Sequence, residues 1–264
     1  MKTRIISAIV LLSIIVPILI LGNKYFSLAV AVIALFAYRE LLNLKYNKDK
    51  IPILIQILGM IITTFLVLAN SFYSFEFGLS YKGLIGVLLI FLLPTLYYKK
   101  DNYNTKDAFY MIGITLSISL IFNSFILIRN FKSGLYVFIY LLIITVLTDT
   151  FAMFTGMLIG KHKLCPTISP KKSWEGSIGG SIIATASASF FYHKLIGPIN
   201  YKIIIITLLL SIIGQLGDLV FSRIKRDNDL KDYSNIIPGH GGILDRLDSI
   251  IFVVICYVLL HSFI

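Results

Sequence analysis

The fold class is decided by residues 201–226, which read YKIIIITLLLSIIGQLGDLVFSRIKR. Most of this stretch is apolar, and a helix of about 20 apolar residues crosses roughly 30 Å of hydrocarbon. Its polar members Gln215, Asp218, Ser222 and Lys225 are three, four and three residues apart, so an α-helix places them on one face. An acid at bilayer depth is costly and by default functional. The alternative, a snorkelling basic girdle with one capping acid, suits Asp218 poorly because that residue lies too deep.

Stretches of this kind recur along the chain and predict an all-α, polytopic membrane protein of about nine transmembrane helices. The mean hydropathy of +0.88 and the 14% of charged residues lie outside the range of soluble globular domains. We expect the first span to be retained, because its apolar run is long for a signal peptide and no small-x-small cleavage site follows. The expected spans are at about 5–22, 25–43, 51–72, 82–98, 107–128, 135–159, 175–197, 201–221 and 244–263.

The distribution of basic residues predicts a cytoplasmic N-terminus. With that orientation most of the 24 lysines and arginines fall on the cytoplasmic side, as the positive-inside rule requires. The formal net charge of +11 is largely explained by this bias. We therefore expect a multi-pass protein of the plasma membrane whose active site faces the cytoplasm. The basic residues left outside are Lys24, Lys82, Arg129, Lys132, Lys194 and Lys202.

Polar residues within the apolar background are concentrated in the C-terminal part of the chain. We expect N-terminal transmembrane helices over 1–104 and a C-terminal transmembrane catalytic region over 105–264, with a turn-rich linker before the boundary. Close helix packing is predicted where Gly176, Gly180, Ala184 and Ala188 recur at four-residue spacing. The polar residues gather in three places: Asp149, the loop 161–176 and the stretch 215–249.

A glycine-rich loop, Pro238-Gly239-His240-Gly241-Gly242, precedes an acidic helix start. The loop cannot be regular helix and offers backbone N–H groups to an oxyanion, although its pattern alone is a weak signal. Asp245 and Asp248 follow it and share a helical face. Carboxylates among lysines and arginines suit a magnesium–phosphate site, while pairing with the helix dipole is the alternative for one of them. No cysteine–histidine cluster has the spacing of a zinc site.

Taken together, these motifs resemble the signature of the phosphatidate cytidylyltransferase family. Gly160-Lys161 and 169–176 resemble a second region of that family, with Ser173 where threonine is commoner. Asp149 precedes Thr150 and Phe151 where a small residue is usual, which leaves its role open. The signature runs through Ser222-Arg223-Ile224-Lys225-Arg226, Lys231-Asp232-Tyr233-Ser234 and Ile237-Pro238-Gly239-His240-Gly241-Gly242-Ile243-Leu244-Asp245-Arg246-Leu247-Asp248, with no position that breaks the pattern.

The resemblance implies that the phosphate of phosphatidic acid attacks the α-phosphorus of CTP, giving CDP-diacylglycerol and pyrophosphate. Because the nucleophile is already anionic, catalysis reduces to positioning two charged phosphates and screening their repulsion. The implied partners are CTP, phosphatidic acid and membrane lipid, and the implied cofactor is Mg²⁺, in a site for one or two ions. We expect no nucleic-acid partner, and the sequence leaves the oligomeric state open, a homodimer included.

The expected site residues divide into metal ligands and phosphate contacts. Asp218 and Asp245 are expected to bind Mg²⁺, with Asp248 as an auxiliary ligand or as an anchor for a neighbouring arginine, and Lys225 is a further candidate catalytic residue. His240 suits either a contact with pyrophosphate or a bracing role in the turn. Phosphate and lipid-phosphate contacts are expected from Lys171, Lys172, Ser222, Arg223, Arg226, His240, Gly241, Gly242 and Arg246.

Two other functions compete with a cytidylyltransferase. A CTP-dependent lipid kinase, such as a polyprenol kinase, would transfer the γ-phosphate to an alcohol and would need a base for the hydroxyl. A lipid-phosphate transporter would use Asp149 and Asp218 as coupling-ion ligands, but it gives the glycine-rich loop and the lysine pair no purpose. CTP labelled at the α-phosphate separates all three, because only a cytidylyltransferase moves that label into lipid.

Overall fold

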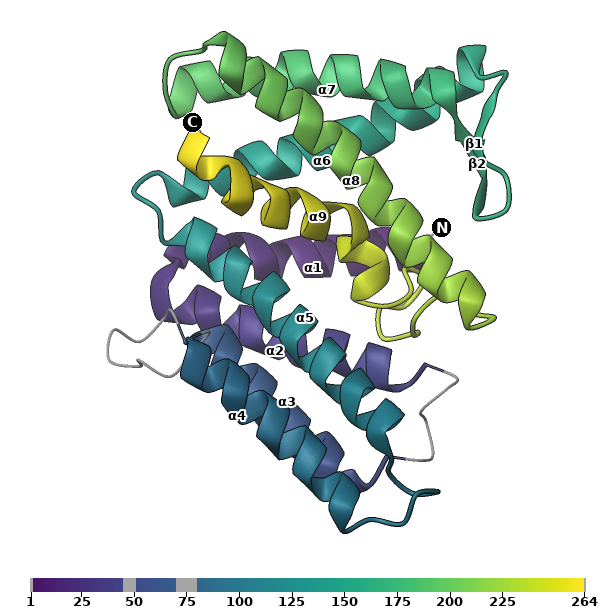
Figure 1. The fold of residues 1–264 in the computed structure, drawn as a ribbon. Helices are drawn as coiled ribbons and strands as arrows, with labels where there is room; N and C mark the ends of the chain where they lie inside the picture. The colour runs from purple at the N-terminus through teal and green to yellow at the C-terminus, as the bar shows by residue number, and fades with distance from the viewer. Residues whose placement is uncertain (1, 45–50, 70–79, 264) are drawn as a thin grey trace. The chain divides into compact units, whose positions relative to one another are not determined.

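A computed structural model describes residues 2–44, 51–69 and 80–263 (Figure 1). Within these ranges an α-helix is present at each place where a span was expected, and the last residues of the expected span 51–72 lie outside them. In the same ranges, α2, α5, α6 and α8 are long and apolar enough to cross a membrane. The α-helices are α1 (Lys2–Leu21), α2 (Asn23–Leu42), α3 (Ile53–Leu68), α4 (Tyr81–Leu92), α5 (Thr105–Arg129), α6 (Gly134–Ile159), α7 (Trp174–Leu195), α8 (Tyr201–Asp227) and α9 (Leu244–Leu260).

A short hairpin interrupts the helices of this mostly helical chain. Strands β1 (Lys163–Cys165) and β2 (Ser169–Ser173) pair antiparallel in the loop between α6 and α7. This segment is polar and contains Pro166 and Pro170, so it cannot continue either flanking helix. Two short 3₁₀ helices, Leu93–Leu96 and His261–Phe263, extend α4 and α9. The β1–β2 hairpin therefore carries the expected phosphate-binding lysines.

The chain divides into two compact units, of which the first comprises 1–130 and 232–244. Its core is formed by helices α2, α3 and α5, and the buried Tyr38 hydroxyl lies 3.2 Å from Thr115 Oγ1. Asn123 in α5 donates to the carbonyl oxygen of Val67 at 3.0 Å. Helix α5 begins with a capping box in which Asn104 accepts from the N–H of Asp107 and Asp107 accepts from that of Asn104. The segment 232–244 packs with these helices although it follows them by about 100 residues in sequence.

The second unit comprises 131–231 and 245–264, and its closest packing is between α6 and α7. A Cβ atom added at Gly180 would lie 2.6 Å from the carbonyl oxygen of Thr148 and 2.7 Å from the backbone nitrogen of Ala152. Ala184 and Ala188 continue the same face and are fully buried. The packing role predicted for these small residues is therefore confirmed.

A ladder of buried hydrogen bonds joins α6, α7 and α8. The Thr148 and Ser211 hydroxyls are 2.8 Å apart, Ser211 donates to Ser181 at 3.0 Å, and the Gln215 amide donates to Ser181 at 2.9 Å. Such bonds hold apolar helices together where burial of apolar surface contributes little. Gln215 of the predicted polar stripe thus has a packing role, and the stripe leads from this ladder to Asp218.

Candidate active site

A cleft lined by both charged and apolar side chains opens in the second unit between α6, the hairpin, α7 and α8. Its volume is about 680 Å³, within the roughly 300–1,000 Å³ typical of ligand sites. The hairpin contributes basic side chains to its lining, and α6 and α8 contribute acidic ones. The charged residues along the cleft are Asp149, Lys163, Lys171, Lys172 and Asp218. The cleft therefore combines the two kinds of charge that a metal–phosphate ligand requires.

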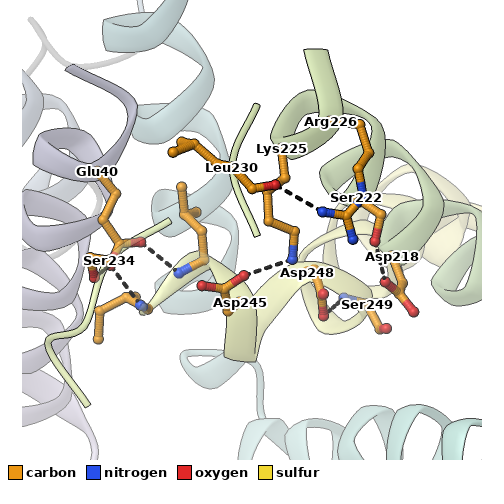
Figure 2. Close-up of polar contacts among 12 residues, drawn as sticks. Glu40, Asp218, Ser222, Lys225, Arg226, Leu230, Ser234, Asp245, Asp248 and Ser249 are labelled. Carbon is orange, nitrogen blue, oxygen red and sulfur yellow. Dashed lines mark hydrogen bonds and ion pairs between the residues drawn. The ribbon is translucent and has the colours of Figure 1, made fainter. Parts of the chain in front are cut away.

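Lys172 and Asp218 form the ion pair that joins the hairpin to α8. The Lys172 Nζ atom lies 2.6 Å from Asp218 Oδ2, and the two side chains are 24% and 26% exposed. One turn along α8, the Ser222 hydroxyl donates to Asp218 Oδ1 at 3.1 Å (Figure 2). The sequence placed Asp218 and Ser222 on one helical face, and the structure bonds them directly. Both charges of the pair remain accessible from the cleft.

Three carboxylates from three helices interact electrostatically. Asp218 in α8 interacts with Asp149 in α6 and with Asp248 in α9, and Asp149 and Asp248 also interact with each other. The Ser249 hydroxyl is hydrogen-bonded to Asp149, and the Ser249 N–H donates to Asp248 Oδ1 at 2.8 Å. Lys172 interacts with Asp149 and Asp218, and Lys225 interacts with Asp248, so the lysines offset part of this negative charge. Asp149, whose role the sequence left open, therefore belongs to the same acidic group as Asp218 and Asp248.

Asp245 is hydrogen-bonded to Lys225, which also interacts electrostatically with Asp248. The Asp245 Oδ1 atom accepts from Lys225 Nζ at 2.7 Å, and the two side chains are only 3% and 10% exposed (Figure 2). This buried ion pair ties the last turns of α8 to the first turn of α9. The two acids share a helical face as predicted, and Lys225 interacts with both, but only Asp248 also interacts with the carboxylates of Asp149 and Asp218.

The donor set fits a magnesium ion that also binds substrate phosphates. Within the described ranges, no group of three or more histidine, cysteine, aspartate or glutamate side chains is arranged to hold a metal ion. Mg²⁺ is commonly bound by one or two carboxylates together with substrate phosphates and water, so a complete protein cage is not required. Asp218 and Asp248 have the chemistry and the mutual proximity for that arrangement.

The arginines that were expected to contact phosphate do not line the cleft. Arg223 pairs with Asp227 at 2.7 Å, one turn further along α8, and both side chains are more than half exposed. Arg226 donates from Nη1 to the carbonyl oxygen of Leu230 at 2.9 Å and so closes the turn after α8. Arg246 is exposed in the first turn of α9. Of the predicted basic residues, the cleft brings together only Lys171 and Lys172.

The glycine-rich loop belongs to the first unit and forms a tight turn. The N–H groups of His240 and Gly241 both donate to the carbonyl oxygen of Ile237, at 2.9 and 3.1 Å. Gly239 and Gly241 have φ values of 75° and 86°, which residues with a side chain rarely adopt. Ser7 in α1 donates to the Pro238 carbonyl oxygen at 3.1 Å and lies 2.8 Å from His240 Nδ1. These contacts favour the bracing role that the sequence left open for His240.

Two glutamates with several partners received no role from the sequence, although Glu175 lies within the second motif region. Glu175 at the start of α7 accepts from the N–H of Lys161 at 3.1 Å and lies 2.6 Å from His162 Nδ1, so it holds the base of the hairpin. Glu40 in α2 accepts from Ser234 and from two backbone N–H groups beside the glycine-rich loop. An acid inside the expected span 25–43 was the signal for Glu40, because ionisable residues in apolar helices are by default functional.

The sequence as a whole is similar to known proteins. The model of the cytidylyltransferase family matches residues 2–264. A protein of Staphylococcus haemolyticus named phosphatidate cytidylyltransferase is 38% identical over 257 residues, which cover 96% of both chains. A protein of the same name from Bacillus subtilis is 36% identical over 267 residues, covering 100% of this chain and 98% of the relative. The similarity therefore extends through the N-terminal helices, where the motifs give no signal.

Proposed function

Because the chain belongs to the cytidylyltransferase family, we propose that it is a membrane-bound nucleotidyltransferase that acts on CTP and phosphatidic acid. It transfers CMP to the lipid phosphate, releases pyrophosphate and forms CDP-diacylglycerol for phospholipid biosynthesis. The relatives named phosphatidate cytidylyltransferase, which match over almost their whole length, support this reaction. The observation that carries the proposal is the Lys172–Asp218 pair in the cleft, because Asp218 also accepts from Ser222, the first residue of the signature, and so links the two motif regions.

The hairpin lysines bind and orient the triphosphate. Lys171 and Lys172 line the cleft from β2, and Lys163 lines it from β1. Fixed ammonium groups offset the repulsion between the two anionic substrates, and an anionic phosphate nucleophile needs no general base. The role of these residues is therefore positional and electrostatic, not proton transfer. Asp149 and Asp218 line the same cleft. Their negative charges compensate the positive charges of the lysines when no substrate is bound.

We assign the Mg²⁺ to Asp218 and Asp248, and Asp245 to holding Lys225. When bound, the ion would neutralise phosphate charge and polarise the phosphorus under attack. Asp218 and Asp248 interact with each other. The Lys172–Asp218 pair is about a quarter exposed, so a substrate and its ion can reach it, whereas the Lys225–Asp245 pair is buried. Asp149 adds a third negative charge beside them and strengthens the attraction for a cation. This assignment keeps two of the three ligands expected from the sequence.

We also propose about nine membrane spans, a cytoplasmic N-terminus and an active site on the cytoplasmic side of the plasma membrane. The support is the bias in basic residues together with the apolar helices that lie at the expected places. CTP would then arrive from the cytoplasm and phosphatidic acid from the inner leaflet. Each substrate stays in its own phase until the two meet in the cleft.

The reaction is tested with the purified protein in detergent, phosphatidic acid, Mg²⁺ and CTP labelled at either the α- or the γ-phosphate. We expect the α-label to enter the extracted lipid and the γ-label to remain in the aqueous phase as pyrophosphate. Chelation of Mg²⁺ should stop the transfer and its addition should restore it. Entry of the γ-label into lipid would identify a kinase, and entry of neither label would leave the chain without the proposed activity.

A further inference from the structure

Glu40 is a carboxylate buried inside an apolar helix of the N-terminal half. Glu40 lies in α2 and is 2% exposed, and an acid buried there without partners would be strongly unfavourable. Its partners are three donors on the segment 232–244, which belongs to the same unit. Glu40 Oε1 accepts from the Ser234 hydroxyl at 2.6 Å and from the Ile243 N–H at 2.8 Å, and Oε2 accepts from the Leu244 N–H at 2.9 Å. Figure 2 shows Glu40 and Ser234 side by side.

The two backbone bonds lie where α9 begins. Helix α9 starts at Leu244, and the first N–H groups of a helix have no partner inside it. A carboxylate there supplies an acceptor and interacts favourably with the positive end of the helix dipole. Glu40 thus caps a helix that begins 204 residues further along the chain.

The close approach of Glu40 also explains a glycine of the signature loop. A Cβ atom added at Gly242 would collide with Glu40 Oε1 and would lie 2.9 Å from Ser234 Oγ. The space beside Gly242 is therefore taken by the carboxylate and its hydroxyl donor. This gives Gly242 a packing reason that is independent of phosphate binding.

We propose that Glu40 is a positioning residue of the transferase, which fixes where α9 starts. The start of a helix sets the direction in which its later residues project, and Asp245 and Asp248 lie one and four residues beyond Leu244. Glu40 holds the loop through Ser234 and Ile243 and the helix through Leu244. It thereby sets the residue at which the helix that carries a buried ion-pair partner and a candidate metal ligand begins. The inference rests on the proposed function only for its effect on turnover.

Glu40→Gln in the full-length protein is the direct test. Glutamine keeps the size of the side chain but turns one acceptor oxygen into an NH₂ group that faces a donor. We expect CMP transfer to fall at least tenfold, the Mg²⁺ concentration for half-maximal activity to rise at least threefold, and the amides of Ile243 and Leu244 to exchange with deuterium at least tenfold faster. The exchange measurement needs no substrate, so it tests the anchor even if the wild-type protein transfers no CMP.

Asp107→Asn is the matched control, because Asp107 is also a buried carboxylate that caps a helix of the same unit. It is 3% exposed and accepts from the N–H of Asn104 at 3.0 Å, at the start of α5. We expect this variant to unfold at a lower temperature while turnover of the folded protein and its Mg²⁺ dependence stay within twofold of the wild type. An equal loss of turnover in Asp107→Asn would reduce Glu40 to a general stabilising residue and overturn the proposal.

Ser234→Ala keeps the test decisive if Glu40→Gln does not fold. It removes one of the three donors, and we expect a loss of turnover of about threefold together with faster exchange at Ile243. Combined with Glu40→Gln, it should add little further loss, because both changes act on the same anchor. Wild-type turnover in Glu40→Gln would contradict the proposal. If Glu40→Gln does not fold, wild-type turnover in Ser234→Ala would contradict it instead. Unchanged deuterium exchange at the amides of Ile243 and Leu244 would also contradict it.

Discussion

The Lys172 ammonium lies 2.6 Å from the Asp218 carboxylate, and this pair connects the β1–β2 hairpin to helix α8. About a quarter of each side chain is exposed, so both groups can be reached from the cleft. Asp218 also accepts from Ser222 and interacts with two further carboxylates, from α6 and α9. The pair is therefore the point at which the basic and the acidic sides of the candidate site meet.

Replacing Lys172 should reduce catalysis far more than stability. In Lys172→Gln we expect CMP transfer to fall by about 10²-fold or more, the typical loss when one donor to developing negative charge is removed. The unfolding midpoint should change little, because a pair that is partly exposed contributes little to stability. Initial rates with α-labelled CTP measure the first effect and thermal unfolding in detergent the second.

Lys100→Gln provides the comparison, since Lys100 is an exposed residue of the loop before α5. It should retain the wild-type rate. Equal rates for Lys172→Gln and Lys100→Gln would remove Lys172 from the site.

Breaking the buried Lys225–Asp245 pair should destabilise the protein. Lys225→Met leaves the Asp245 carboxylate buried without its lysine, and we expect a loss of about 3–5 kcal/mol in the free energy of unfolding. The double variant Lys225→Met/Asp245→Asn should unfold at a higher denaturant concentration than the single variant, because position 245 then carries no charge beside the missing ammonium. Denaturant titration in mixed micelles measures both. A double variant that is no more stable than Lys225→Met would show that the pair does not determine stability here.

The β1–β2 hairpin should loosen when Glu175 is changed. In Glu175→Gln we expect faster deuterium exchange at the amides of Lys161 and His162, because glutamine cannot accept from both amides and from the imidazole as the carboxylate does. CMP transfer should fall as well, since Lys171 and Lys172 are carried by the same hairpin. Mass spectrometry of the peptide containing these amides detects the change. Unaltered exchange would mean that the hairpin is held by other contacts.

The α6–α7 contact should not tolerate even one added methyl group at Gly180. A Cβ there meets the backbone of α6 at 2.6 and 2.7 Å, so we expect Gly180→Ala to cost about 1–3 kcal/mol. Gly113→Ala in α5 is the control, because a Cβ at that position meets nothing within 4 Å. It should leave stability unchanged or raise it by up to about 1 kcal/mol through helix propensity. Unfolding in detergent compares the two, and similar midpoints would contradict the packing explanation.

The sequence by itself determined where the helices lie, which residues share a helical face, and the family. These properties are local, since apolar runs and three- and four-residue spacings can be read along a single segment. The spacing placed Asp218 and Ser222 together correctly and identified Gly180 as a packing residue. It also predicted that Asp245 and Asp248 share a face.

Only the tertiary structure decided what each of these side chains meets. Asp245 is bonded to Lys225, whereas Asp248 interacts with Asp149 and Asp218, and nothing in their spacing distinguishes the two acids. Glu40 was missed because its partners lie 194 to 204 residues away. Ion pairs and helix caps of this kind depend on which segments come together in space. A periodic pattern fixes the direction of a side chain on its own helix and carries no information about the neighbour that it will contact.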